Sequence, residues 1–421
     1  MRTKLLAPVC LLLGVLPIGT GDISRQTGAT QLAGGATQAV GRAQATTGSD
    51  PAAWLPARDA LKQLPTELLS MLEENPYSYF RYVNRPWGRQ VCDAFRADLP
   101  SLPRVRVHGD AHVEQYAFTA DEFGLDDFDD SAEGPSVIDL TRFVGSLELA
   151  ARRLGWTRDV DRVIDDFFRG YERALGTTTA YRPSTPAIVV RRRPLAAREP
   201  AAFLAWTDSL MQPVTDDVAE STRKSLAGVA RLLARERPGT TVEQFALKKV
   251  GLIRLGIGSL LTPKLLARVE GATKDPDDDL VLEAKALSDL AAIDCLIVPP
   301  VEETLRVIDG SRQIGRLKHD VLSIVPNVLV KDREVRDWWI RTWDRTYGEV
   351  DVDHFESAEE LREVAHDAGA QLGSTNLPAT ADGAGLRARE RQAIARLQPR
   401  IRALARELSR DIVGAWERLR R

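Results

Sequence analysis

Lysine and cysteine are scarce in this chain, and its net charge is small. Its 421 residues include ten lysines and three cysteines, and the formal net charge is only −3. So small a charge gives no electrostatic argument for a nucleic-acid partner, because nucleic-acid affinity rests largely on phosphate contacts. Where lysine is rare, a lysine that ends an apolar run is more informative than usual.

Long apolar runs are also missing, and the longest lies at the N-terminus. Arg2 and Lys4 precede an apolar run at residues 5–18, and small residues follow at 19–21. This is the pattern of an export signal over residues 1–21. The run is short for a membrane span, so we expect a mature chain without a transmembrane span, exported to the periplasm or the outside. A mis-assigned start would instead leave the protein in the cytoplasm.

The next stretch, residues 22–50, consists mostly of Gly, Ala, Thr, Gln and Ser. With almost no large apolar side chains it cannot bury enough surface to fold, which predicts a disordered linker. Beyond it, Cys92 and Cys295 are the remaining cysteines. We expect either one disulfide, if the compartment is oxidising, or two buried thiols.

The rest of the chain predicts an α+β protein in three parts. Apolar spacing predicts helices at 57–74, 140–154, 158–175, 201–237, 302–317, 358–372 and 386–420, the last interrupted near Pro399. Short strands are predicted within 247–271 and at 280–286, 321–330 and 338–343. This order indicates a helical lobe at 51–240, a small β-rich lobe with one helix at 241–345, and C-terminal helices at 346–421 that pack on the helical lobe.

Carboxylates gather between residues 108 and 139, each after a short apolar run. His-Gly-Asp-Ala-His stands at 108–112, Asp127 precedes an aromatic residue, and Asp139 follows twelve positions later. Phosphoryl transfer needs one carboxylate to orient the attacking hydroxyl and oxygen ligands to hold Mg²⁺. The same segment also allows a metal-dependent hydrolase, in which a transition metal is held by His108, Asp110, His112 and Asp127.

A second stretch of interest begins at Gly256. Gly256, Gly258 and Ser259 lie between apolar segments, where a strand–turn–strand can bring backbone N–H groups to phosphates. A plain hairpin turn is the alternative. Lys285 ends the apolar strand at 280–285, and its burial is costly unless it meets an anion. We expect a glutamate at 302 or 303, in the following helix, to pair with it.

Together these motifs resemble the kinase-like phosphotransferases, the superfamily of aminoglycoside and choline kinases, with the motif order rotated along the chain. The resemblance implies a protein-kinase-like two-lobed fold that uses ATP and Mg²⁺ to phosphorylate a hydroxyl of a small-molecule or protein acceptor. It implies a positioning or base role for Asp110 and Mg²⁺ ligation by Asp127 with Gln115. Nucleotide binding would fall to Gly256, Gly258, Ser259 and Lys285, and structural support to His108, His112, Asp139 and Arg142.

The rotated order is similar to that of a bacterial family known as domain of unknown function 2252. The resemblance covers residues 75–377 and rests on the segments at 75–81, 108–112, 125–130, 134–142, 256–259 and 283–285. The chain departs from the family pattern at four positions, which are Gln115 in place of Asn, Leu261, Pro263 and Asn376. These departures point to weakened or altered nucleotide chemistry. An exported, non-catalytic kinase-like binding protein is therefore the main alternative to an enzyme.

Overall fold

A computed structural model describes residues 53–177, 181–298, 305–330, 334–375 and 381–421. All of them belong to one compact unit that begins at Asp50. The proposed export signal and linker, the glutamates at 302 and 303, and Asn376 lie outside these ranges. Helices and small antiparallel sheets are mixed, which confirms the α+β class. Within the described residues, no helix combines the length and apolar character that a membrane crossing requires.

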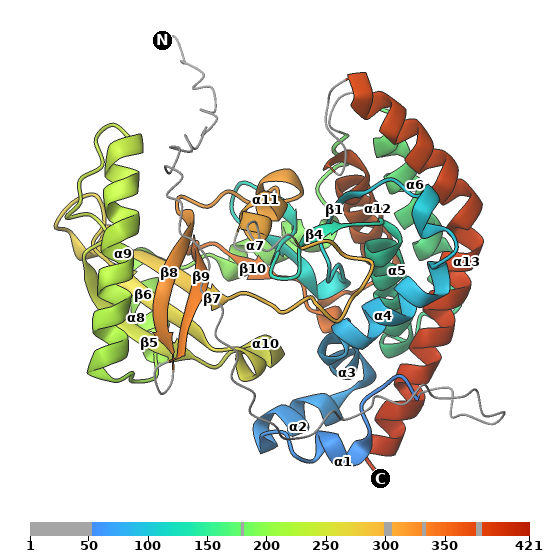
Figure 1. Ribbon diagram of the computed structural model, residues 1–421, viewed down its shortest axis with the longest axis horizontal. Coiled ribbons are helices and arrows are strands. Elements are labelled where there is room, and N and C mark those ends of the chain that lie inside the picture. The colour runs from blue at the N-terminus through green and yellow to red at the C-terminus, as the bar shows by residue number, and fades with distance from the viewer. Residues whose placement is uncertain (1–52, 178–180, 299–304, 331–333, 376–380) are drawn as a thin grey trace, which may run out of the picture. The chain divides into compact units, whose positions relative to one another are not determined.

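Helices form the surroundings of the acidic segment. The central one, α5, is buried along nearly all its length, and α13 and α4 pack against it while α12 packs along α6 (Figure 1). The helices of this group are α1 (Arg58–Leu61), α2 (Thr66–Glu74), α3 (Pro76–Tyr82), α4 (Asn84–Phe95), α5 (Val137–Arg153), α6 (Val160–Leu175), α12 (Ala358–Thr375) and α13 (Ala381–Leu419).

Two glycines let α6 and α12 approach each other closely. A Cβ atom at Gly170 would clash with the carbonyl oxygen of His366, and one at Gly369 would clash with that of Phe167. Glycine at these helix positions costs conformational entropy, about 1 kcal/mol each relative to alanine, which the close packing offsets. The C-terminal helices thus pack on the earlier helices.

Short strands hold the acidic loops in place. β1 (Val105–Val107) pairs antiparallel with β4 (Ala132–Gly134). β2 (Tyr116–Phe118) lies between β3 (Phe123–Leu125) and β10 (Gly348–Glu349), again antiparallel. The two loops that carry Asp110 and Asp127 therefore begin and end at paired strands.

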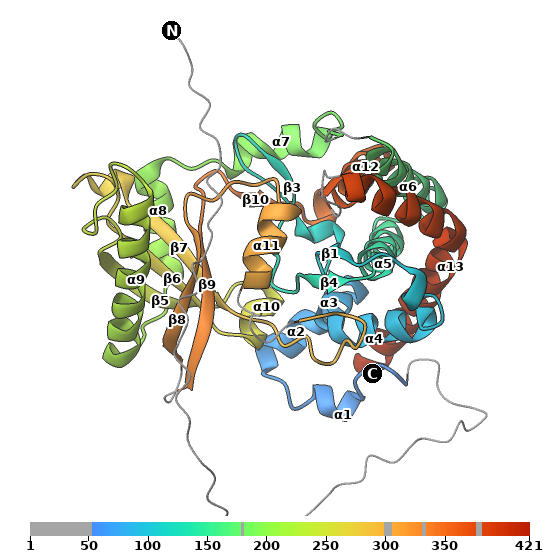
Figure 2. The same ribbon diagram turned by 45° about the horizontal axis from the view of Figure 1, so that its top comes forward.

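A five-stranded antiparallel sheet forms the other part of the unit, in the order β5-β6-β7-β9-β8. Its strands are β5 (Leu247–Ile253), β6 (Lys264–Val269), β7 (Leu280–Ala286), β8 (Leu322–Val330) and β9 (Glu334–Thr342). Alternate residues such as Leu282, Ala284 and Ile340 form an apolar core with α9 (Asp216–Glu236) on one face (Figure 2). The residues between them therefore point to the opposite face.

The structure differs from the sequence prediction in the placement of two helices. α9 and α8 (Pro200–Leu210) were assigned to a helical lobe at 51–240, but their apolar side chains pack on the sheet. The β-rich region also contains more than one helix, since α10 (Gly256–Leu261) and α11 (Leu305–Gln313) both lie within it. A further helix, α7 (Ala187–Ala196), forms where no helix was predicted.

Two prolines had effects that were not predicted. The expected helix at 57–74 is divided into α1 and α2, because Pro65 stands at the N-cap of α2 with an extended backbone. By contrast, α13 continues for 39 residues through Pro399. The open question about the cysteines is answered, since Cys92 and Cys295 form a disulfide across a sequence separation of 203 residues.

Candidate functional site

The loop after β1 is held by a carboxylate from α5. Asp139 Oδ2 and Oδ1 accept hydrogen bonds from the backbone N–H groups of His108 and Gly109, at 2.7 and 2.8 Å. Gly109 has a φ of 85°, and a Cβ atom there would clash with the carbonyl oxygen of Asp130. Glycine is therefore required at this position. Asp139 thus fixes the loop that presents Asp110.

Asp110 lies between a cation and an imidazole. Arg142 donates a hydrogen bond from Nε to Asp110 Oδ1 at 2.8 Å, and its guanidinium also stacks 3.5 Å from the centre of the Phe80 ring. His112 Nε2 lies 3.7 Å from Asp110 Oδ2. Burial raises the pKa of Asp110 to about 6 although the Arg142 charge opposes the rise. A carboxylate with a pKa near neutrality suits general base catalysis.

The two histidines of the loop have supporting positions. His108 Nε2 lies 2.8 Å from the backbone oxygen of Asp126, and His108 Nδ1 accepts from the N–H of Asp110 at 3.3 Å. Burial, with help from neighbouring arginines, holds the pKa of His112 well below its ordinary value. His112 is therefore neutral, and both nitrogens of His108 are already engaged in hydrogen bonds, which leaves His108 without a nitrogen for a metal ion.

Two of the four carboxylates in the turn at residues 126–130, those of Asp127 and Asp129, face the same lysine, Lys285. Asp127 adopts a left-handed backbone with a φ of 64°, a conformation that Asp tolerates better than most residues. Its Oδ1 accepts a hydrogen bond from Lys285 Nζ at 2.6 Å. Asp130 accepts from Asn84 Nδ2 at 2.9 Å. Asp126 forms an ion pair with Arg341, and Asp129 Oδ2 lies 3.5 Å from Lys285.

The sheet supplies a row of charges that face this turn. Register pairs place Lys264 of β6, Lys285 of β7 and Trp339 of β9 side by side. One step along the strands, Glu283 of β7 stands opposite Arg341 of β9. All five side chains belong to the face that α9 does not cover.

Glu283 and Arg341 complete the charge balance around the lysines. Arg341 donates from Nε to Glu283 Oε2 at 2.9 Å, and Glu283 lies 3.9 Å from both Lys285 Nζ and Lys264 Nζ. Burial alone would lower the pKa of Lys285, but Asp127, Asp129 and Glu283 together raise it above its ordinary value. For Lys264, burial and the Lys285 charge lower the pKa despite Glu283.

Asp127 and Asp129 differ in protonation although they share one lysine. Burial opposes ionisation of Asp127, but the Lys285 charge outweighs it and holds the pKa well below its usual range. Burial and the negative charge of Asp127 raise the pKa of Asp129 to about 7. Of these two carboxylates, Asp127 is therefore ionised, whereas Asp129 is partly protonated near neutral pH.

The glycine segment forms a short helix instead of the expected strand–turn–strand. Gly256 begins α10, which has six residues, and has a φ of 72°. The Ser259 hydroxyl donates to the Gly256 carbonyl oxygen at 2.9 Å, within the helix itself. Gly258 lies beside Lys264, whose Nζ would be 3.7 Å from a Cβ atom at that position. The segment borders the lysine row, while the serine hydroxyl is occupied.

Gln115 approaches the acidic turn through its backbone. It lies in the 3₁₀ turn Val113–Gln115, and its carbonyl oxygen accepts from the N–H of Asp126 at 2.8 Å. The structure thus places Gln115 next to the residue that precedes Asp127. Of the predicted site residues, Asp110 and Arg142 come together on the loop side, and Asp127 meets Lys285 on the sheet side.

Oxygen ligands for a hard cation are present in the turn. Asp127 and Asp129 are carboxylates, and Asp129 Oδ1 is buried without a hydrogen-bond partner in the described part of the chain. Mg²⁺ is usually held by one or two carboxylates together with substrate phosphates, so these residues fit it. The two buried ammonium groups likewise fit an anionic nucleotide. Over the described ranges, no group of three or more His, Cys, Asp or Glu is arranged to hold a metal ion.

Three site residues were missed in the sequence, namely Lys264, Glu283 and Arg341. The sequence did contain a signal for Lys264, because it is another of the few lysines and lies beside an apolar run. Glu283 and Lys285 are two positions apart on one strand and therefore share a face. Only the strand register shows that Arg341 meets them.

Comparison with known proteins gives one match. No curated protein and no solved structure is significantly similar to the chain. A family model does match, over residues 69–191, which include the Asp110 loop, the acidic turn and α5. This segment of the chain is similar to the family described as "Uncharacterized protein conserved in bacteria (DUF2252)".

Proposed function

We propose that this protein is a kinase-like phosphotransferase that moves the γ-phosphoryl group of ATP to a hydroxyl of a small-molecule or protein acceptor. The observation that carries the proposal is the 2.6 Å contact between Lys285 Nζ and Asp127 Oδ1, which joins residues 158 positions apart. In phosphoryl transfer, a lysine and a metal-binding aspartate work side by side on the phosphates. The proposal includes a two-lobed kinase-like fold in which the motif order is rotated along the chain.

Each role follows from a contact in the site. Asp110 receives the proton of the acceptor hydroxyl. At the same time the hydroxyl oxygen of the acceptor bonds to the γ-phosphorus of ATP, and the bond from that phosphorus to the leaving ADP breaks. Asp110 Oδ2 is the candidate oxygen, because Oδ1 is bonded to Arg142. Lys285 and Lys264 balance the charge of the phosphates. Asp127, Asp129 and Gln115 would hold Mg²⁺, which would supply further charge neutralisation.

Glu283 acts as a counter-ion of Lys285, the role that the sequence analysis expected of a helix glutamate. It lies on the same strand as Lys285, and Arg341 fixes it from the neighbouring strand at 2.9 Å. A counter-ion built into the sheet keeps the lysine charged and oriented without movement of a helix. The glutamates at 302 and 303 lie outside the described residues, so their pairing stays a prediction.

A second candidate function is an exported, non-catalytic kinase-like binding protein. Two observations favour it, the Arg142 side chain bonded to Asp110 and the Ser259 hydroxyl bonded within α10. The Cys92–Cys295 disulfide supports an oxidising compartment, where ATP is scarce. This candidate retains ligand binding in the same site without turnover.

Binding and turnover of ATP separate the two candidates. The purified full chain is heated with and without ATP and Mg²⁺, and release of labelled γ-phosphate is followed in parallel. At a hundred times the Kd, a ligand stabilises the folded state by about 2.7 kcal/mol. The enzyme predicts both stabilisation and turnover, with turnover lost in Asp110→Asn. Stabilisation without turnover indicates the binding protein, and no stabilisation rejects the enzyme.

Matched lysine variants test the assignment of the site. Lys285→Met keeps the length of the side chain but removes the charge, and we expect it to abolish the ATP-dependent shift. Lys264→Met should weaken the shift. Lys274→Met is the control, because Lys274 lies in the turn after β6 with 85% of its side chain exposed. An equal shift in all three variants would contradict the assignment.

A further inference from the structure

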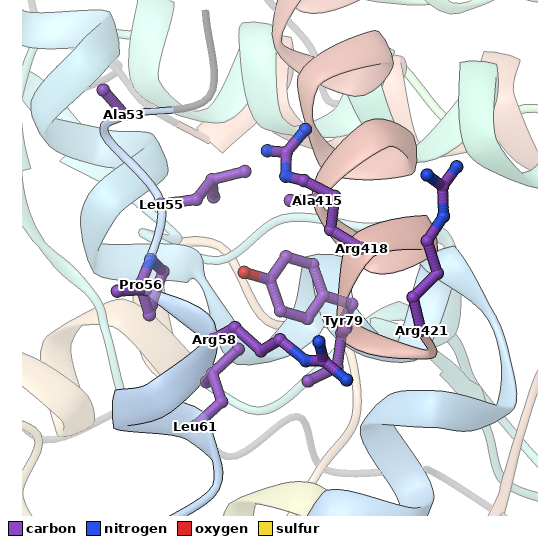
Figure 3. A pocket seen from close by; sticks show the side chains of 11 residues that line it. Ala53, Leu55, Pro56, Arg58, Leu61, Tyr79, Ala415, Arg418 and Arg421 are labelled. Atoms are coloured by element: carbon purple, nitrogen blue, oxygen red, sulfur yellow. The ribbon is translucent and has the colours of Figure 1, made fainter. Parts of the chain in front are cut away.

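A pocket of about 470 Å³ lies between the segment that leads into α1 and the C-terminal end of α13 (Figure 3). It shares no residue with the acidic site. Small-molecule sites usually enclose about 300–1,000 Å³, so its size suits a ligand. Its inner residues are buried and mostly apolar, namely Leu55, Leu61, Tyr79, Ala415 and Leu419.

The Tyr79 side chain is the polar group within this apolar lining. Tyr79 is 1% exposed, and its hydroxyl has no hydrogen-bond partner among the residues that the structure describes. Figure 3 shows the ring between the segment at Leu55 and Pro56 and the end of α13. A buried hydroxyl without an acceptor is costly, and such groups in native proteins usually have an explanation. A ligand that supplies an acceptor provides one.

The charged residues of the pocket have one sign. Arg58, Arg418 and Arg421 line it and are exposed at its edge, and the eleven lining residues include no Asp or Glu. The Arg418 charge acts on the Tyr79 hydroxyl, where it partly opposes the burial that raises the pKa of Tyr79 to about 12. Tyr79 is therefore a neutral O–H donor at physiological pH, beside a cation.

We propose that this pocket binds a single-chain anionic amphiphile with a carboxylate or phosphate-ester head. The apolar chain lies against Leu55, Leu61 and Leu419. The head accepts the hydrogen bond of Tyr79 and is balanced by the arginines at the edge. An oxyanion is favoured over a neutral head because only cations accompany the donor, and an apolar body is favoured by the buried lining.

Calorimetric titration of the full chain tests this with four probes, which are decanoate, decyl phosphate, decanol and inorganic phosphate, each below its micelle concentration. We expect saturable one-to-one binding of decanoate or decyl phosphate, and which of the two binds more tightly identifies the head group. Decanol and inorganic phosphate should bind at least tenfold more weakly. Equal binding of decanol, equal binding of inorganic phosphate, or no saturable binding of either amphiphile would overturn the proposal.

Variants locate the ligand. Tyr79→Phe removes one hydrogen bond to a charged group and should weaken amphiphile binding about tenfold, while the unliganded protein should melt at the same or a higher temperature. Arg58→Ala combined with Arg421→Ala should weaken amphiphile binding and leave decanol unaffected. Arg410→Ala is the control, since Arg410 is exposed on α13 and does not line the pocket. Comparable weakening in this control would place the ligand elsewhere.

Discussion

Asp110→Asn is expected to stabilise the protein at neutral pH while it removes the proposed base. Burial, opposed by Arg142, raises the pKa of Asp110 from 3.8 to about 6. The difference is 6 − 3.8 = 2.2 pKa units, and each unit corresponds to about 1.36 kcal/mol. Ionisation of Asp110 therefore lowers the free energy of unfolding by about 3 kcal/mol. Stability lost for the sake of a reactive group is common in active sites.

The pH dependence gives this prediction its sign. The pKa of Asp110 is higher in the folded state, so the folded protein holds the proton more tightly than the unfolded chain. The stability that the protonated Asp110 carboxyl contributes is fully present below about pH 3.8, declines as the pH rises toward about 6, and is absent well above pH 6. Asn cannot ionise, so the variant lacks this decline. Urea denaturation from pH 4 to 8 should give equal stability at pH 4 and a gain of about 3 kcal/mol at pH 8.

The opposite outcome is well defined, because Arg142 is almost fully buried. If its ion pair with Asp110 outweighs the cost of burial, the variant leaves a buried charge uncompensated and loses about 3–5 kcal/mol at pH 8. Such a loss would refute the reasoning. Asp121→Asn serves as the control, since Asp121 is exposed in the loop between β2 and β3 and its variant should follow the unmodified protein at every pH.

Three further predictions test other parts of the structure. Asp127→Ala leaves its lysine partner buried with fewer counter-charges and should lower the free energy of unfolding in urea by about 3 kcal/mol. Gly109→Ala should displace the loop that carries Asp110, because its Cβ atom would clash with the Asp130 carbonyl, and should cut any turnover about a hundredfold. Unchanged turnover would contradict the loop geometry. Reduction of the Cys92–Cys295 disulfide should lower the free energy of unfolding by about 2–5 kcal/mol. The loss should appear as a lower Tm in dithiothreitol, and the Cys92→Ala variant should show the same lower Tm in the absence of dithiothreitol.

Local patterns in the sequence predicted much of the helical structure. The helices expected at 140–154 and 158–175 correspond to α5 and α6, because their apolar residues recur with the helical period. Pro399 was expected to interrupt the last helix, yet α13 runs through it. Apolar residues of α13 on both sides of this proline, among them Ile394 and Ile401, are buried in the main core. Tertiary packing therefore outweighs the local cost of proline.

The site was predictable where its residues are close in sequence. The loop at 108–112, Asp127 and Asp139 follow short apolar runs, and the structure brings Asp139 under the loop. Lys264 was overlooked because its relation to Lys285 exists only through the register of β6 and β7. The strand–turn–strand predicted at Gly256–Gly258 was wrong for a different reason. A Gly-x-Gly fits a turn and the first turn of a helix equally well, since neither requires a side chain there.

Charged side chains of the site connect the acidic turn to the sheet. Asp126 binds Arg341, Arg341 binds Glu283, and Glu283 with Asp127 flanks Lys285. Asp126, Glu283, Lys285 and Arg341 are buried and Asp127 is partly buried. Removal of any one therefore leaves a buried charge with fewer partners, which costs more than an exposed ion pair contributes. The network therefore favours one arrangement of turn and sheet. An anionic ligand that enters beside Lys264 meets a cation whose pKa is lowered by burial and by the Lys285 charge, and it adds negative charge next to both lysines.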